Sequence, residues 1–443
     1  MSGKTPTWHV ARKASGAVEK RIRALKPGGK MQDLPRDLWH PSFARYMDDE
    51  ERKGGPNMRI VRLRPDAPSL TVTGFIFNKF VHPVEHRFIT PREAARLQDF
   101  PDDVVFCGRL SDVHKQIGNA VPVRLGAAVA RAMMEHGRSH SLFSDAPPTC
   151  LSLFSGAGGL DIGFREAGFD IIGHVEFDKA AAATISGIFR KKIEPISITD
   201  IPDPVAWLES VSGRKHVDVL IGGPSCQAFS QIGRQKADAD PRGTMVYEYA
   251  RFLGEIRPNL FLMENVANMK GVAGGRVFRK VMEMFDELGY DVTVKPLCAA
   301  DYGSAQKRVR LIFIGVKRGL APLVSLPLPT HSGQHRGVGD AFAGLPALMV
   351  DRIAPPLEAW PLLGNEGQKP FPEIADYYIQ VGLGPDNLWR WWAAIPNVPA
   401  GEDFPPAKES GWAWSRGEAI GAASKATLAV INGENGPSLS DPA

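Results

Sequence analysis

The residue with the clearest potential for covalent chemistry is a cysteine in a loop rich in glycine and proline. Cys226 stands in the stretch GGPSCQAFS, which follows the apolar run Val217–Ile221. A cysteine at the carboxyl end of a strand is placed as a nucleophile would be, because a thiolate adds readily to an electrophilic carbon. The alternative is a buried, unreactive thiol, which is the commoner state of a lone cysteine. The loop alone leaves both interpretations open.

A carboxyl group and two guanidinium groups follow later in the chain. Glu264 comes directly after the apolar run Leu260–Met263, and Arg308 and Arg310 stand in QKRVR before the next run. A buried glutamate can stay protonated and donate a hydrogen bond. Two arginines that alternate along a strand share one face, which suits a phosphate or a base edge. Otherwise Glu264 is a structural or helix-capping acid, and the arginines belong to an exposed strand edge.

A glycine-rich turn and a spaced acid indicate a cofactor. The stretch FSGAGGLDIGF begins at Phe154, and Glu176 lies 20 residues after Gly156, at the end of the next apolar run. Glycines between a strand and a helix let a ligand approach the helix's first amides. An acid at this distance holds ribose hydroxyls in nucleotide-binding units. Asp161 replaces the last glycine of GxGxxG, and a tight structural turn is the alternative, but the combined pattern favours a cofactor that contains ribose.

The elements that must position these residues alternate between strand and helix. Strand-length apolar runs occur at Leu151–Phe154, Ile171–Val175, Val217–Ile221, Leu260–Met263 and Leu311–Val316, and helical spacing occurs at Gly126–Met134 and Arg276–Leu288. This alternation predicts an α/β fold with a doubly wound, mostly parallel sheet. Ligands bind at the carboxyl ends of the strands in such sheets, where the loops described above begin.

Composition limits the class of protein. The 443 residues carry a net charge of +4, with 43% hydrophobic and 23% charged residues, as expected for a globular chain of two or three domains. We find no apolar run long enough to span a membrane and no secretory signal at the N-terminus. The four cysteines are far apart, which argues against a disulfide framework or a zinc site and favours a reducing cytoplasm. Residues 1–64 carry a surplus of basic residues, whereas residues 321–443 are acidic and hold six of the nine tryptophans.

The four motifs FSGAGGLDIGF, GGPSCQAFS, ENV and QKRVR, in this order, resemble those of the DNA (cytosine-5)-methyltransferase family. The stretches PSLTV, RFITPREAARLQDFP and KQIGNAVP, between residues 68 and 122, are similar to motifs that the family carries last. Because they come first here, the chain resembles a circularly permuted member. Permutation is tolerated where the original ends lie close together at the surface.

The resemblance implies a methyltransferase (Rossmann-like) sheet, a smaller target-recognition domain and a division of the chain. Residues 1–83 would form part of the recognition domain, 84–135 the closing segment of the catalytic domain, and 136–149 a linker. Residues 150–320 would bind S-adenosylmethionine and carry the catalytic groups, and 321–443 would complete the recognition domain. Phosphate contacts are expected mainly from the basic N-terminal segment, since a DNA-reading surface is usually basic.

The resemblance also assigns roles to residues. Cys226 would attack C6 of a flipped-out cytosine, Glu264 would hydrogen-bond N3, Arg310 would hold O2, and Arg308 would lie nearer the DNA phosphates. Cofactor contacts would come from Phe154, Ser155, Gly156, Gly158, Leu160, Glu176, Asp200, Pro224, Asn119 and Val121, with no metal. The family usually has proline and glycine where this chain has Ser225 and Ala228. Neither change removes a reacting group.

The expected partner is double-stranded DNA, with a restriction endonuclease as a possible functional counterpart. The protein is expected to act as a monomer and to bind no membrane. It would work in the bacterial cytoplasm near the nucleoid and be encoded by a bacterium or by a phage. Alternatives are an RNA cytosine-5 methyltransferase acting on transfer RNA and a catalytically silent DNA-binding regulator. The regulator interpretation predicts loss of Cys226, Glu264 or Arg310, and all three are present. A nicotinamide oxidoreductase would explain neither the cysteine loop nor QKRVR.

Overall fold

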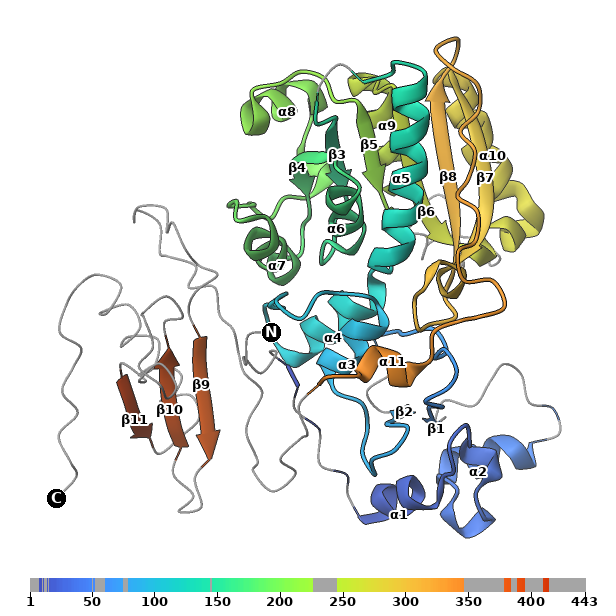
Figure 1. Ribbon diagram of the computed structural model, residues 1–443, viewed down its shortest axis with the longest axis vertical. Coiled ribbons are helices and arrows are strands. Elements are labelled where there is room, and N and C mark those ends of the chain that lie inside the picture. The colour runs from blue at the N-terminus through green and yellow to red at the C-terminus, as the bar shows by residue number, and fades with distance from the viewer. Residues whose placement is uncertain are drawn as a thin grey trace.

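A six-stranded mixed sheet forms the centre of the molecule (Figure 1). The computed structural model describes residues 8–9, 11, 14, 16–49, 51, 60–74, 79–143, 146–225 and 245–345, together with the backbone of three short strands between 378 and 413. The sheet has the order β4-β3-β5-β6-β8-β7. Its strands are β3 (Thr149–Leu153), β4 (Asp170–Val175), β5 (Val219–Gly222), β6 (Leu260–Val266), β7 (Tyr290–Cys298) and β8 (Val309–Lys317).

Strands β4, β3, β5 and β6 are parallel, whereas β8 runs antiparallel to both β6 and β7. The chain moves to one side of β3 with β4 and to the other side with β5. Open α/β sheets bind ligands where the strand order reverses in this way, which in this sheet is at the carboxyl ends of β3 and β5. The predicted α/β class is confirmed. The prediction missed β7, whose residues are only half-buried along most of the strand and lack a continuous apolar run.

Helices cover both faces of the sheet. They are α5 (Val123–Ser139), α6 (Gly159–Glu166), α7 (Lys179–Phe189), α8 (Pro204–Ser212), α9 (Met245–Ile256) and α10 (Arg276–Glu287). Side chains that alternate along the strands separate into two cores: Ile221 and Leu262 pack with α5 and α6, whereas Leu220 and Phe261 pack with α8, α9 and α10. This two-residue period explains why the strands appear in the sequence as continuous apolar runs.

The long helix α5 precedes β3 in the chain and lies along α6 on one face of the sheet (Figure 1). An added Cβ at Gly163 of α6 would lie 2.5 Å from the backbone nitrogen of Ala127 in α5. The two helices therefore pack backbone against backbone, which only glycine permits at this position. Helix α5 continues to Ser139, so the predicted start of the linker at residue 136 is wrong: residues 136–139 belong to the helix.

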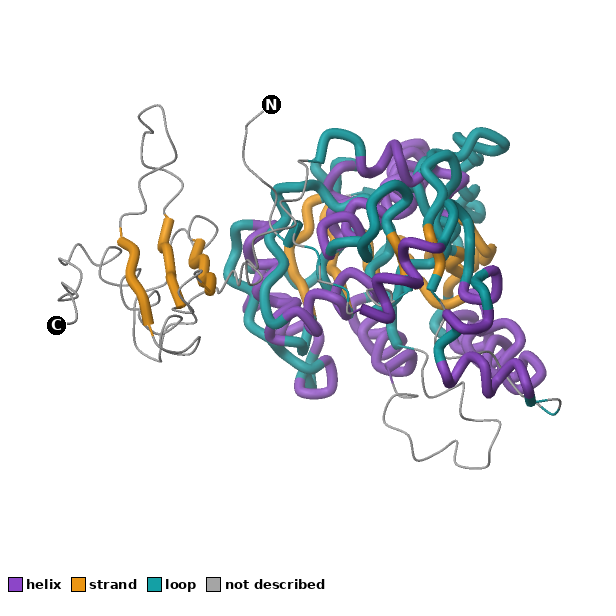
Figure 2. Tube along the Cα trace, turned by 90° about the horizontal axis from the view of Figure 1, so that it is seen from below, coloured by secondary structure: helices purple, strands orange, loops and turns teal. Residues whose placement is uncertain are grey.

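A second group of elements lies beyond one end of the sheet. Helices α3 (Pro91–Leu97), α4 (Leu110–Asn119) and α11 (Val338–Phe342) adjoin the sheet, and the N-terminal elements lie farther away (Figure 1). Figure 2, seen from below, shows helices on either side of the strands. The latter are α1 (Gly16–Ala24), α2 (Pro41–Asp48), β1 (Val61–Arg62), β2 (Phe80–Val81) and the 3-10 turns η1 (Met31–Asp33) and η2 (Arg36–Leu38). Arg62 holds this N-terminal unit together because its buried guanidinium donates to the carbonyls of Ile22, Leu25 and His82.

Segments from the two halves of the chain are tightly joined around residues 304–310. Gln306 accepts a hydrogen bond from the Val72 amide at 2.6 Å and donates to the Leu97 carbonyl at 2.9 Å. Farther along, Val338 donates its amide to the Ala67 carbonyl, so the start of the C-terminal region contacts the N-terminal one. The described parts of this region, residues 61–74 and 79–122, are thus built into the same body as β8.

The remaining elements are short. They are the 3-10 turns η4 (Ile198–Asp200), η6 (Ala267–Gly275) and η7 (Ala299–Tyr302), and a three-stranded antiparallel sheet of β9 (Tyr378–Leu383), β10 (Trp389–Ala394) and β11 (Glu409–Ala413). Among the described helices none is both long and apolar enough to cross a bilayer.

Candidate active site

The turn between β3 and α6 has a backbone that favours glycine. Phe154, Gly156 and Gly158 all have positive φ, at 54°, 56° and 76°, and Gly158 caps α6 in the left-handed conformation. A Cβ at Gly156 would meet nothing within 4 Å, so conformation and open space, not crowding, characterise this position. Ser155 and Leu160 are buried, and Ser155 donates its hydroxyl to Ser152. A ligand at this turn would therefore meet backbone groups of the loop.

Glu176 holds the turn in place. Its carboxylate accepts hydrogen bonds from the amides of Gly156 at 2.7 Å and Asp178 at 2.8 Å. Burial raises the pKa of this carboxyl group, although the two amides favour the charged form. A buried carboxylate beside an open glycine turn fits the role of an acceptor for ribose hydroxyls, as the spacing predicts. That role itself remains a prediction.

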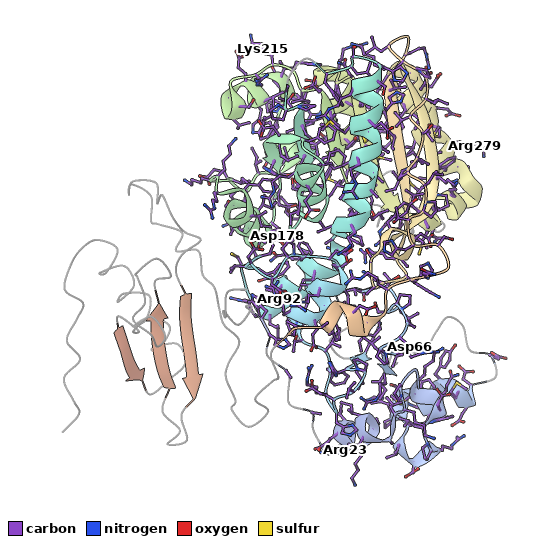
Figure 3. The ribbon with its side chains drawn as sticks, viewed as in Figure 1. Arg23, Asp66, Arg92, Asp178, Lys215 and Arg279 are labelled. Carbon is purple, nitrogen blue, oxygen red and sulfur yellow. The ribbon has the colours of Figure 1, made fainter. Side chains whose placement is uncertain are left out.

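Phe177 is a candidate binding residue that the sequence reasoning missed. Its side chain is 66% exposed, directly after Glu176, although phenylalanine is usually buried. The Nζ atom of Lys115 lies 5.7 Å from its ring centre and also bonds Asp178 at 2.8 Å. Figure 3 shows Asp178 at the end of the sheet nearest the unit that contains Arg92. The available signal was an aromatic residue next to the acid at a strand end, where a ring could stack on a nucleobase.

The other predicted cofactor residues surround the same end of the sheet. Asn119 is exposed at the end of α4, and the carbonyl oxygen of Val121 would lie 2.4 Å from a Cβ added at Gly159, the first residue of α6. Asp200 is exposed in η4, and the segment leading to η4 is anchored where Ile196 donates to the Glu176 carbonyl. The closing segment thus contacts the glycine turn, while a contact of Asp200 with adenine remains a prediction.

Glu264 and Arg310 form an ion pair at the carboxyl end of β6. The Nε atom of Arg310 lies 2.6 Å from Oε1 of Glu264, and both side chains are largely buried. Burial raises the pKa of Glu264, while the positive charges of Arg310 and Arg308 oppose this shift. The other carboxylate oxygen, Oε2, would lie 3.0 Å from a Cβ at Gly223. The acid therefore faces the loop that follows β5.

That loop is described only as far as Ser225. Pro224 is buried and accepts a hydrogen bond from the Asn265 side-chain amide at 3.1 Å, and Ser225 is exposed. Cys226 and Ala228 lie outside the described residues. The structure brings the start of the cysteine loop against Glu264, and the position of the thiol stays a prediction. The contact of Pro224 with a cofactor stays a prediction.

The expectation that Arg308 lies near DNA phosphates is wrong. Its side chain is 1% exposed and donates hydrogen bonds to the carbonyls of Val72 at 2.6 Å and Gly118 at 2.9 Å. Arg308 also precedes β8, which begins at Val309. Arg310 pairs with Glu264, whereas segments of the N-terminal half cover Arg308, so the two guanidinium groups do not offer one shared surface to a phosphate. No local pattern indicates this cover, because the two carbonyls lie 236 and 190 positions away in the chain.

Comparison with known proteins places this geometry in a family. The model of the C-5 cytosine-specific DNA methylase family matches residues 15–135 and 149–340, more than two thirds of the chain. The type II methyltransferase M.FnuDI of Fusobacterium nucleatum is 39% identical over 175 residues, which are 38% of this chain and 47% of that protein. M1.HphI of Haemophilus parahaemolyticus is 39% identical over 204 residues, or 45% and 53% of the two chains.

A solved structure of a putative DNA modification methyltransferase, encoded within a prophage of E. coli, is 28% identical. The match covers 45% of this chain and 56% of that one, with a TM-score of 0.36. The chain spans about half the length of the curated relatives it matches. The family match itself extends over both the closing segment and the sheet, so this chain belongs to the C-5 cytosine-specific DNA methylase family.

Proposed function

We propose that the protein transfers a methyl group from S-adenosylmethionine to C5 of a cytosine that is flipped out of duplex DNA. The observation that carries this proposal is the buried Glu264–Arg310 pair against the start of the cysteine loop. A cytosine presents an acceptor at O2 and a ring nitrogen at N3. A carboxylic acid and a guanidinium at one pocket wall match these two atoms.

In the proposed reaction, the Cys226 thiolate adds to C6 and forms a sulfur–carbon bond, while the ring electrons move toward C5. A proton from Glu264 to N3 balances the negative charge on the ring, and Arg310 donates to O2. After C5 has been methylated, a base removes the C5 proton. The electron pair of that C–H bond then restores the ring double bond and expels the thiolate, and N3 returns its proton to the Glu264 carboxylate. Addition at C6 is needed because unactivated C5 is a poor nucleophile.

The residues around the glycine turn fit the cofactor. Glu176 offers a carboxylate to ribose hydroxyls, Phe177 offers an exposed ring, and Gly156 leaves open space above the turn. When bound, S-adenosylmethionine supplies an electrophilic methyl group. Asn119 and Val121 would cover its methionine end from the closing segment. This chain has Asp161 where the motif GxGxxG, which binds a pyrophosphate, has its last glycine. A carboxylate in the first turn of α6 would repel an anion at this position.

The chain order is part of the proposal. We propose that this protein is a circular permutation in which 84–139 close the catalytic domain, 140–149 join it to 150–320, and 1–83 with 321–443 recognise DNA. The contact of Val338 with Ala67 supports a meeting of the two recognition segments. The relatives are type II methyltransferases, which supports pairing with a restriction endonuclease and a role near bacterial DNA. Action as a monomer completes the proposal.

Methyl transfer from labelled S-adenosylmethionine to unmethylated genomic DNA tests the proposal. Wild type should label DNA at C5 of cytosine in one sequence context, as bisulfite sequencing would show, and Cys226→Ala should not. Transfer RNA serves as a parallel substrate. Label in RNA alone would favour an RNA methyltransferase. Cofactor and DNA binding without transfer to either nucleic acid would favour the silent regulator.

A further inference from the structure

Arg308 is a buried cation that joins three parts of the chain. It lies in the segment before β8, and its guanidinium donates to Val72 and to Gly118, which belong to two separate segments of the N-terminal half. Its Nε has no hydrogen-bond partner among the described residues. Burial lowers the pKa of Arg308 to about 9, so the side chain stays positively charged at neutral pH. A buried charge held in this way is costly to keep, which calls for a reason beyond packing.

One end of this arrangement leads to the proposed cofactor pocket. Gly118 immediately precedes Asn119 at the end of α4, where helix carbonyls lack helical partners and favour a cation. A Cβ at Gly118 would lie 2.1 Å from the Gly74 nitrogen, so the end of α4 and the 72–74 segment are in direct contact. Three residues later, the Val121 carbonyl contacts α6 at Gly159. A shift at the cofactor turn would therefore change the carbonyl that Arg308 binds.

The other end leads to the proposed base pocket. Arg310, two residues along the same segment, pairs with Glu264. The positive charge of Arg308 opposes the rise in the pKa of Glu264, as that of Arg310 does. Movement of Arg308 would alter both the position of Arg310 and the electrostatic environment of Glu264.

We propose that Arg308 is a positioning residue that couples the two pockets, so that cofactor bound against the Asn119–Val121 turn raises the affinity for a DNA cytosine at Glu264 and Arg310. This inference rests on the proposed function. The planar guanidinium is essential because it reaches two carbonyls at once, which a lysine ammonium on a flexible stem does not reproduce. Coupling between sites is reciprocal, so DNA should raise cofactor affinity by the same factor.

The test uses a fluorescent duplex in which the target cytosine is mispaired to ease flipping. Its dissociation constant is measured in the absence and in the presence of S-adenosylhomocysteine. In wild type the cofactor product should tighten DNA binding at least about fivefold, the lower end of typical allosteric coupling. The coupling ratio is the DNA dissociation constant without S-adenosylhomocysteine divided by the constant with it. Arg308→Lys and Arg308→Met should bring this ratio close to one. Titration of S-adenosylhomocysteine with and without the duplex should give the same ratios.

Gln306→Met is the matched control. Gln306 is also buried, lies two residues away and holds the Val72 amide, but it has no hydrogen bond to the end of α4. This variant should lose stability and retain the wild-type ratio. An equal coupling ratio in wild type and Arg308→Lys would overturn the coupling role and leave Arg308 as a structural residue. So would an equal fall of this ratio in Gln306→Met and Arg308→Lys.

A measurement on wild type alone keeps the proposal testable if the Arg308 variants fail to fold. S-adenosylhomocysteine should slow hydrogen exchange of the Val72 and Lys307 amides, which bond to Gln306 and Ser69 around Arg308. Unchanged exchange at these amides, with slowed exchange only at the glycine turn, would contradict it. Failure of the proposed function is separate, because it would appear as absent methyl transfer while both ligands still bind.

Discussion

Glu264 illustrates how the site uses burial at the scale of a single residue. The proposed mechanism needs this carboxyl group protonated, and burial raises its pKa whereas the neighbouring arginines lower it. Because the protonated form is the active one, turnover should fall as pH rises through this raised pKa. Glu264→Gln keeps a donor but has no proton to transfer. Its turnover number should fall by about 10² to 10⁴ and lose this alkaline decline, with cofactor affinity unchanged.

A pH profile of turnover for the two proteins checks this prediction, with cofactor affinity measured by calorimetry. An alkaline decline of equal size in Glu264→Gln would assign the titration to another group. A weaker cofactor affinity in the variant would mean that Glu264 acts on the cofactor pocket as well.

Asp99 gives a prediction about stability. Its side chain is buried beside Ser304 and Arg124, its backbone has a positive φ of 63°, and burial raises the pKa of the carboxyl group to about 7. The folded state therefore holds a proton that the unfolded state releases near pH 4. This contribution is complete below about pH 4 and is lost as pH rises to about 7. Asp99→Asn, which tolerates the same backbone, should be the more stable protein by a few kcal/mol at pH 8.

Urea unfolding at pH 5 and pH 8 measures this effect in wild type and Asp99→Asn. The free energy of unfolding should change less between these two pH values in the variant than in wild type. Identical pH dependence in both proteins would show that Asp99 is ionised in the folded state throughout this range.

At the scale of elements, the contact of α5 with α6 has a sharp requirement for glycine. A methyl group at Gly163 would lie within 2.5 Å of α5 backbone, whereas one at the exposed Gly187 in α7 would meet nothing within 4 Å. Gly163→Ala should lower the free energy of unfolding by about 1–3 kcal/mol or more, as overpacking does. Gly187→Ala should raise it by about 0.5–1 kcal/mol, because alanine loses less entropy in a helix.

Chemical denaturation of the two variants gives the comparison directly. Similar stabilities for Gly163→Ala and Gly187→Ala would mean that α5 and α6 can separate without cost. That result would contradict the close packing of these two helices.

The contact between α4 and the loop after β4 gives a prediction about binding. Lys115 pairs with Asp178 and lies near the Phe177 ring, and the pair is partly exposed. Exposed ion pairs contribute about 0.2–1 kcal/mol, so Lys115→Met should weaken S-adenosylmethionine binding by no more than about fivefold. Lys115→Arg should bind like wild type. Calorimetry at low and high salt measures the affinity of each variant for S-adenosylmethionine. An unchanged affinity in Lys115→Met would mean that Lys115 does not contribute to cofactor binding.

Sequence patterns predicted the elements that have strong local signals. The five apolar runs became strands because their side chains are buried on both faces, and the FSGAGG turn follows β3 as expected. The strand β7 was missed because its exposed edge has no such run. The cover over Arg308 was missed because it depends on residues 72 and 118, whose position no local pattern encodes. Phe177 could have been found from its place next to Glu176.

At the scale of the whole molecule, the order of the chain separates motifs that the fold brings together. Residues 69–74 and 97–122 precede the glycine turn in sequence, yet they contact residues 304–308 and α6 in space. The N-terminal half therefore completes both proposed pockets. This arrangement is what the proposed circular permutation requires, because the segments that come first in the chain must reach the sheet that follows them.

The most direct test of the central claim is covalent trapping at Cys226. Fluorine at C5 blocks loss of the C5 proton, so a duplex carrying 5-fluorocytosine at the mapped target should remain bonded to the enzyme once the methyl group has been transferred. With S-adenosylmethionine, wild type should form a complex that survives denaturation, with the DNA attached to Cys226 by peptide mass spectrometry. Cys226→Ala should form none. A trapped complex at another residue, or methylated DNA from Cys226→Ala, would contradict the mechanism.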